Sequence, residues 1–552
     1  MPSTVPPPAE VLTPERVRDP DAWITYVSWA VVAFATLQIL LFSFGRDQGI
    51  YALVGTGILD GQAPYSDLWD FKPPGIHLVY AFAQGLLGRT MLASRLVEAA
   101  GLIGMVFAFR ALSVEWFGSR LPGLLAGALA TLVHAQLEFW HTGQPEIFGG
   151  MLTVFSLVLL VGERFPRQRP WAWIVAGLFF GAAFLLKPPL GGGALVLAAY
   201  LFTRRHQRGA TTLQALAPGL VMAASAALVL AACGSWLWWR GAWDAAAWTF
   251  VDFAPGYTTL SWVGQSAPGL FYQAFSDVFV RFSALLLLGV LAALLLQPLH
   301  AREREALLLL LGLISVHAAG IAMQGKFFAY HYSATLPLVS FIAGLGFYKL
   351  WRRLYIAGPS GILAFALFVV LVGSMRSGVG DLRQDFWWRS GARIRYLLRV
   401  GDVATRELLD KELYTVADFD LNAARRAALE LRRITEAGST VYIWGFEPII
   451  YWMAERRPAS RFIYNVPQRV SWGEEEGTRA ELMRSLEEHP PEAVLVQRED
   501  VFPAVTGSYS DSAEALMAFT ELNDWLKRDF RWSASIDSFE LYERHQARAK
   551  MR

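Results

Sequence analysis

Long apolar runs recur through the first two thirds of this chain, and they constrain its fold more than any other feature. About eleven runs approach the length of a bilayer-spanning helix, the shorter ones requiring tilt or burial. They lie at residues 24–44, 92–112, 121–139, 147–161, 171–186, 192–202, 220–238, 282–296, 307–323, 336–350 and 356–373. With 54% hydrophobic residues, the chain carries more apolar surface than a single aqueous core buries. The sequence therefore predicts a polytopic α-helical membrane protein with about eleven transmembrane helices.

Basic residues between these runs predict the orientation of the chain, because Lys and Arg are retained on the cytoplasmic side. Short basic segments that fall on one side of the membrane include residues 164–169, 204–208, 302–304 and 352–353. We therefore expect a cell-membrane protein, in a bacterial inner membrane, with a cytoplasmic N-terminus and an extracytoplasmic C-terminal domain. The polar, Pro-rich residues 1–22 are predicted to form a disordered cytoplasmic tail.

The composition changes after residue 374, where charged residues become frequent and long apolar runs stop. Strand-like runs at 440–445, 461–465, 492–497 and 538–544 alternate with helical patterns at 422–435, 478–488 and 513–527. The predicted domains are thus a membrane domain at 23–374 and a soluble α/β domain at 375–552. A net charge of +2 provides no basic field, so nucleic acid is not an expected partner.

The loop after the first run, residues 45–90, is too polar to span a membrane and too apolar for a free loop. Residues 48–59 are predicted to form an amphipathic helix on the membrane surface, and Lys72-Pro73-Pro74 to begin a second helix. Asp47 stands just beyond the first span, where a carboxylate can accept a proton from an attacking hydroxyl. Lys72, Lys187 and Lys326 offer the positive charge that a lipid phosphate requires at the membrane boundary.

These residues resemble a signature of the GT-C membrane glycosyltransferases, in the branch of protein O-mannosyltransferases and the lipid A aminoarabinose transferase. That signature has an acid after the first span, a Tyr soon after it, and a later Lys-Pro-Pro; Asp47, Tyr51 and Lys72-Pro73-Pro74 match it. The likeness covers the first half of the membrane region, with weaker echoes to about residue 347. The branch often has Asp-Glu where this chain has Asp47-Gln48, which leaves one acid there.

The resemblance implies a GT-C-like fold and an inverting sugar transfer from a polyprenyl-phosphate-linked donor to a protein, lipid or polysaccharide hydroxyl. Asp47 would be the general base, and Glu146 would orient the acceptor or help to deprotonate it, with Glu138 and His141 as weaker candidates. Donor phosphate would contact Lys72, Lys187, Lys326 and His331, with Tyr51, Tyr330 and Tyr332 in support. No cofactor is required, although Asp70, His141 and His331 leave a divalent metal open.

Other interpretations explain the same residues. An acid after a span is often a solvated helix cap, and lysines at helix ends often anchor the helix at the interface. Asp60, Asp67 and Asp70 suit turns. The alternative functions are a transporter or flippase-type protein for a lipid-linked or small solute, and a non-catalytic membrane scaffold. No internal repeat of the kind that transporters show is visible.

Overall fold

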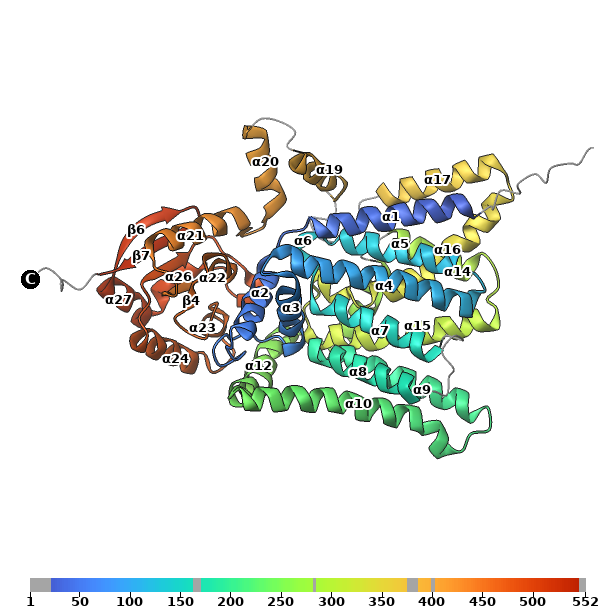
Figure 1. The fold of residues 1–552 in the computed structure, drawn as a ribbon, viewed down its shortest axis with the longest axis horizontal. Helices are drawn as coiled ribbons and strands as arrows, with labels where there is room; N and C mark the ends of the chain where they lie inside the picture. Colours follow the sequence, from blue (N-terminus) through green and yellow to red (C-terminus); the bar gives the residue numbers. More distant parts are fainter. Residues whose placement is uncertain (1–20, 162–169, 281–283, 375–385, 399–402, 546–552) are drawn as a thin grey trace, which may run out of the picture.

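A computed structural model describes residues 21–161, 170–280, 284–374, 386–398 and 403–545. The chain forms a long helical body, with a strand-containing C-terminal domain at one end of it (Figure 1). The tail predicted at 1–22 lies almost entirely outside the described residues.

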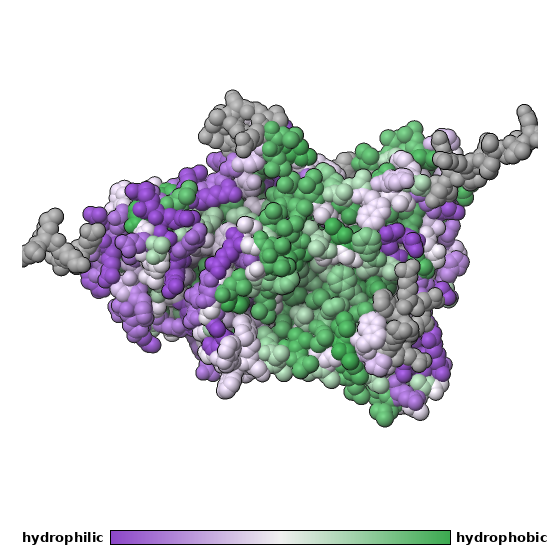
Figure 2. Space-filling model, viewed as in Figure 1, coloured by the Kyte–Doolittle hydropathy of each residue, from purple (hydrophilic) through white to green (hydrophobic). Residues whose placement is uncertain are grey.

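The helical body is built from apolar helices, most of which run roughly along the long axis of the molecule (Figure 1). They are α1 (Ala22–Leu40), α4 (Met91–Phe117), α5 (Leu121–Ala135), α7 (Pro145–Val161), α8 (Pro170–Leu186), α9 (Gly193–His206), α10 (Thr212–Trp239), α13 (Ala267–Val280), α14 (Ala284–Leu295), α15 (Ala301–Gln324), α16 (Leu336–Tyr355) and α17 (Pro359–Ser374). Figure 2 shows hydrophobic residues in a broad band over this body and hydrophilic residues over the C-terminal domain and the opposite end.

This pattern makes the chain a membrane protein. Among the described residues, four helices are long and apolar enough to cross a bilayer: α1, α4, α10 and α15. The number becomes five if α13 and α14, which meet at 88°, form one bent span. The count of eleven spans remains a prediction, because several of the other helices are shorter than a typical span.

Helices α8 and α9 are separated by a break at Lys187-Pro188-Pro189. Helix α8 ends at Leu186, a 3₁₀ turn covers Pro188–Gly192, and α9 begins at Gly193. Proline has no N–H to donate and clashes with the preceding helical turn, so consecutive prolines end the helix here. Lys187 therefore lies between two helices, where its side chain is not confined by a regular helical turn.

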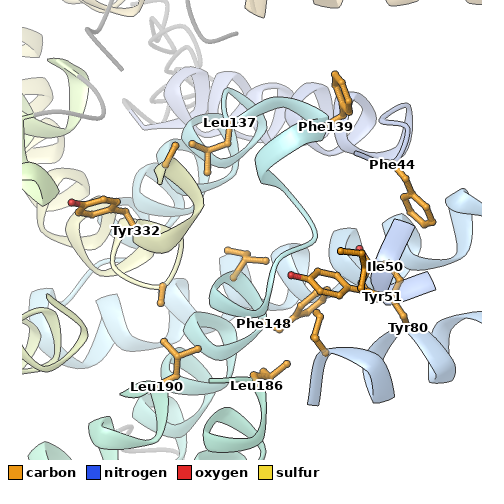
Figure 3. Packing of buried hydrophobic residues seen from close by; sticks show 14 of the residues in the cluster. Phe44, Ile50, Tyr51, Tyr80, Leu137, Phe139, Phe148, Leu186, Leu190 and Tyr332 are labelled. Carbon is orange, nitrogen blue, oxygen red and sulfur yellow. The ribbon is translucent and has the colours of Figure 1, made fainter. Parts of the chain in front are cut away.

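The first loop forms two helices, α2 (Arg46–Leu59) and α3 (Pro74–Leu87), and Pro74 begins α3 as predicted. The expectation that α2 lies on the membrane surface is wrong, because most of its residues are buried. It packs between α3 and α22 (Ile449–Ala454) of the C-terminal domain. Figure 3 shows side chains of the loop region, including Phe44, Tyr51 and Tyr80, gathered in the core beside Phe148.

The C-terminal domain contains a five-stranded sheet in the order β4-β3-β5-β7-β6. Strands β3 (Thr440–Trp444), β4 (Arg457–Pro458) and β5 (Ala493–Gln497) are parallel, whereas β6 (Phe530–Ile536) and β7 (Phe539–Arg544) are antiparallel to their neighbours. Helices α21 (Leu421–Ile434), α24 (Glu475–Glu488), α26 (Ser512–Ala518) and α27 (Thr520–Asp529) accompany it. The runs at 440–445, 492–497 and 538–544 are strands as predicted, while β6 was not predicted.

The run at 461–465 does not form a strand of this sheet. Instead, the Trp69 amide in the first loop donates to the Arg461 carbonyl oxygen at 2.8 Å, and Phe462 forms an isolated bridge with Trp69. Its backbone is thus used to dock the domain on the loop. Trp452 adds a second contact, donating from Nε1 to Thr56 Oγ1 at 3.1 Å.

Candidate active site

A large cavity of about 1060 Å³ lies where the helical body meets the C-terminal domain. Its walls are mostly apolar and come from the first loop, α8, α10, the segment before α16 and the C-terminal domain. Six of the residues predicted as general base, phosphate contacts or their supports line it: Asp47, Lys72, Lys187, Lys326, Tyr330 and His331. They come from four separate segments, and only the fold brings them to one place.

Asp47 is the second residue of α2, and its carboxylate reaches the cavity wall. Its Oδ2 accepts a hydrogen bond of 3.2 Å from Nε2 of Gln144, in the segment before α7. The hydroxyl of Tyr51 donates to Oε1 of the same glutamine at 2.9 Å. Tyr51 is fully buried and does not line the cavity, and its hydrogen bond is connected to Asp47 through Gln144.

Lys72 lies in the turn before α3, where Tyr65 donates its hydroxyl to the Lys72 carbonyl at 2.9 Å. Its ammonium lies 5.0 Å from the Phe71 ring and 5.6 Å from the Tyr330 ring. Burial disfavours the charged form, but the carboxylates of Asp47, Asp70 and Glu146 outweigh burial and raise the pKa of Lys72. Lys72 therefore stays protonated at neutral pH.

Lys187 pairs with Glu146, whose Oε1 lies 2.5 Å from Nζ. Glu146 is the second residue of α7 and is buried, and it does not line the cavity. The structure thus places the predicted second acid behind a lysine. Glu146 therefore contacts the cavity only indirectly, through its ion pair with Lys187 and its charge near Lys72.

Lys326 follows α15, and its ammonium lies over the ring of Tyr257 at 3.6 Å from the centroid. Burial, with a smaller contribution from Lys72, lowers the pKa of Lys326 to about 7. His331 contacts the carbonyl oxygen of Lys326 through Nδ1. Burial and the neighbouring Lys187 and Lys72 lower the pKa of His331 well below its ordinary value, so its ring is neutral.

Of three other sequence candidates, Tyr332 and Glu138 lie outside the cavity lining and His141 belongs to it. Tyr332 does not line the cavity, and its hydroxyl donates to Asp277 Oδ2 at 3.1 Å. Glu138 is buried and forms ion pairs with Arg389 and Arg393 of α19 (Phe386–Leu397). His141 lines the cavity, with its ring 5.8 Å from that of Tyr330.

Asp70, for which the sequence suggested a turn or a share in a metal site, is buried at the cavity wall. Its Oδ1 accepts a hydrogen bond of 2.7 Å from Tyr464, and its Oδ2 lies 3.3 Å from His77 Nε2. Burial raises the pKa of the carboxyl, but His77, Lys72 and Tyr464 together lower it below its ordinary range. Asp70 is therefore a permanent anion beside Lys72.

Sequence reasoning missed three contributors to this region: Gln144, Tyr257 and Tyr464. Gln144 stands two residues before Glu146, and this proximity to a predicted site residue could have indicated it. Tyr464 comes from the C-terminal domain and carried no signal. Within the described ranges, no group of three or more His, Cys, Asp and Glu side chains is arranged to hold a metal ion.

Comparison with known proteins gives the fold. The sequence matches no protein-family model and no curated protein. The structure is similar to that of ArnT from Cupriavidus metallidurans bound to undecaprenyl phosphate, with a TM-score of 0.56, 13% identity, and coverage of 95% of this chain and 98% of that one. The apo state of the same protein gives a TM-score of 0.54 at 13% identity, over 94% of this chain and 97% of that one. The chain therefore has the GT-C fold, the fold of the aminoarabinose transferase.

Proposed function

We propose that this protein is a membrane glycosyltransferase that moves a sugar from a polyprenyl-phosphate-linked donor to an acceptor hydroxyl. The observation that carries this proposal is one cavity in which a carboxylate, Asp47, meets three lysines within largely apolar walls. The apolar walls suit an isoprenoid chain, the lysines suit a phosphate, and the carboxylate suits a general base. ArnT, which has the same fold, was crystallised with undecaprenyl phosphate.

The reaction is an inverting displacement at the anomeric carbon of the donor sugar. The acceptor oxygen forms a bond to this carbon while its proton passes to Asp47. The bond between the anomeric carbon and the phosphate oxygen breaks, and its electron pair leaves with polyprenyl phosphate. Lys72, Lys187 and Lys326 stabilise the negative charge that grows on the phosphate oxygen. Glu146 holds Lys187 through their ion pair, and His331 and Tyr330 line the cavity that would hold the phosphate.

We place the cavity and the C-terminal domain, residues 375–552, on the extracytoplasmic side of a cell membrane. Arg204 and Arg352 lie in the last turns of α9 and α16, and Arg302 lies in the first turn of α15. Helices α9 and α16 begin near cavity-lining segments, and α15 ends at Gln324, which lines the cavity. The three basic helix ends are thus the ends remote from the cavity, and basic ends remain cytoplasmic.

The test compares Asp47→Asn with Asp60→Asn, a control in the same loop whose carboxylate forms an exposed ion pair with Arg89. Each purified protein is placed in nanodiscs with a panel of radiolabelled undecaprenyl-phosphate sugars and bacterial envelope extract as the source of acceptor. Release of undecaprenyl phosphate and transfer of label are measured. We expect the control to match the wild type and Asp47→Asn to lose about 100-fold to 10,000-fold in rate.

Binding separates the base from the phosphate contacts. Asp47→Asn is expected to bind undecaprenyl phosphate as the wild type does, because the lysines are unchanged. Lys72→Met is expected to lose about tenfold or more in affinity, since it removes a charged hydrogen-bond donor to phosphate. Transfer by Asp47→Asn at the wild-type rate would refute the role of this carboxylate. Absence of transfer by the wild type with every donor would favour a transporter or a scaffold.

A further inference from the structure

A buried ion pair at the start of α4 lies outside the cavity, yet it is connected to Asp47. Arg95 and Glu98 are fully buried one helical turn apart, with Arg95 Nη1 donating to Glu98 Oε2 at 2.9 Å. Glu98 Oε1 accepts a hydrogen bond of 2.6 Å from the backbone N–H of Gly143. The same oxygen lies 2.7 Å from Nε2 of His134 on α5. Neither Arg95 nor Glu98 lines the cavity.

Arg95 also binds the backbone of two segments that carry site residues. Its Nη2 donates to the carbonyl oxygen of Ser43 at 2.7 Å and to that of Phe139 at 3.2 Å. Its Nη1 donates to Thr142 Oγ1 at 2.9 Å. Ser43 lies just before α2, which carries Asp47, and residues 139–142 lead to Gln144. One guanidinium thus holds both sides of the hydrogen bond between Gln144 and Asp47.

The backbone at Gly143 is shaped for this contact. Gly143 has φ of +70°, and a Cβ there would lie 2.8 Å from the Tyr80 hydroxyl and 3.0 Å from Arg95 Nη1. Tyr80 donates its hydroxyl to the Gly143 carbonyl at 3.1 Å, so both polar groups of this residue are bound. Only glycine tolerates this conformation and this space without strain. The position of the next residue, Gln144, is therefore set by Glu98 and Tyr80.

The side chain of Gln144 is also oriented. Tyr51 donates to Oε1, so the amide must present its N–H₂ group on the other side, where it meets Asp47 Oδ2 at 3.2 Å. This hydrogen bond restricts the orientation of the carboxylate. Among the described residues, this hydrogen bond goes to Oδ2 and no side chain or backbone group donates to Oδ1. It is the oxygen available to an acceptor hydroxyl.

A contribution to the stability of the fold does not by itself explain the buried ion pair between Arg95 and Glu98. Removing two charges from water is costly, and buried pairs are often replaced by apolar side chains without loss of stability. A buried pair does hold the groups around it in one arrangement when all of its hydrogen bonds are formed. Here the arrangement that it holds is the register between α2 and the segment 139–144.

We propose, on the basis of the sugar transfer proposed above, that Glu98 and Arg95 are positioning residues for Asp47, and that they act through Gly143 and Gln144. A base must sit within hydrogen-bond reach of the proton that it removes. A displacement of about 1 Å at a reacting group costs about 100-fold in rate. A neutral amide at position 98 loses the ion pair with Arg95 and accepts a weaker hydrogen bond from Gly143, which loosens the hold on Gln144 and so on Asp47.

The test is a double-mutant cycle on purified protein in nanodiscs, with Glu98→Gln, Gln144→Met and the double variant. We expect each single variant to lose roughly 10-fold to 100-fold in kcat, with the KM for the donor and the Kd for undecaprenyl phosphate unchanged. The double variant is expected to lose no more in kcat than the more impaired of the two single variants, because both changes break one chain of contacts. Glu98→Asp is expected to recover part of the lost rate if its shorter carboxylate reaches Gly143.

Several outcomes would overturn the inference. Multiplying losses in the double variant would show that Glu98 acts by another route, and a raised KM or weakened undecaprenyl phosphate binding would show a general structural defect. Glu98→Gln can fail to fold because Arg95 then lacks its anion. In that case Gln144→Met decides alone, and an unchanged kcat refutes the positioning role. A wild-type protein without transferase activity refutes the proposed function itself, and the positioning role with it.

Discussion

Lys326 should make phosphate binding depend on pH near neutrality. Its pKa is lowered to about 7 by burial and by Lys72, whereas Lys72 itself has a raised pKa. A bound phosphate raises the pKa of Lys326 again, so binding takes up a proton wherever the free protein has lost it. Affinity is therefore greatest below pH 7 and falls as the pH rises through this value. For a free pKa of about 7, the charged fraction of Lys326 falls about 90-fold from pH 6 to pH 9, which sets the upper limit of the effect.

The assay uses a polyprenyl phosphodiester, whose single charge does not change over this range, so that only the protein titrates. Its affinity is measured in nanodiscs from pH 6 to pH 9 by calorimetry. At pH 8, two buffers of different ionisation enthalpy report uptake of about 0.9 proton per ligand bound. Lys326→Arg is the matched control, because arginine stays charged throughout and should bind with little pH dependence. A flat wild-type profile, or an arginine variant with the same decline, would refute this reasoning.

Two further predictions concern the supports of the cavity lysines. Glu146→Gln leaves Lys187 without its buried anion and should lower the free energy of unfolding by about 3–5 kcal/mol; adding Lys187→Met should restore part of it, as measured by thermal unfolding in detergent. If the double variant is less stable than Glu146→Gln, the pair does not work in this way. Gly75→Ala would place a Cβ 2.6 Å from the backbone of Leu185 and should cost about 1–3 kcal/mol, with lower transferase activity because α3 shifts against α8. Gly85→Ala, on the same helix, is the control, since its Cβ would meet only a flexible side-chain end at 3.2 Å.

The outline of the fold and much of the cavity wall could be predicted from local sequence. Apolar runs indicate helices that a bilayer stabilises. Prolines mark the end of α8 and the beginning of α3, and this effect depends only on local sequence. Asp47 and Lys72 could be predicted because both flank such elements. Lys187 was found for the same reason, since it stands at the proline break. These features depend on residues that are near one another along the chain.

The tertiary structure alone decided which groups meet. Glu146 pairs with Lys187 across 41 positions, and Gln144 reaches Asp47 across 97. Residues 461–465 have a strand-like pattern, but their backbone binds Trp69 because the domain docks on the first loop. Local sequence sets the backbone preference of each segment. Whether a carboxylate faces a cavity or a buried lysine depends on the packing of segments far apart in the chain, and this packing also determines the pKa of Lys326.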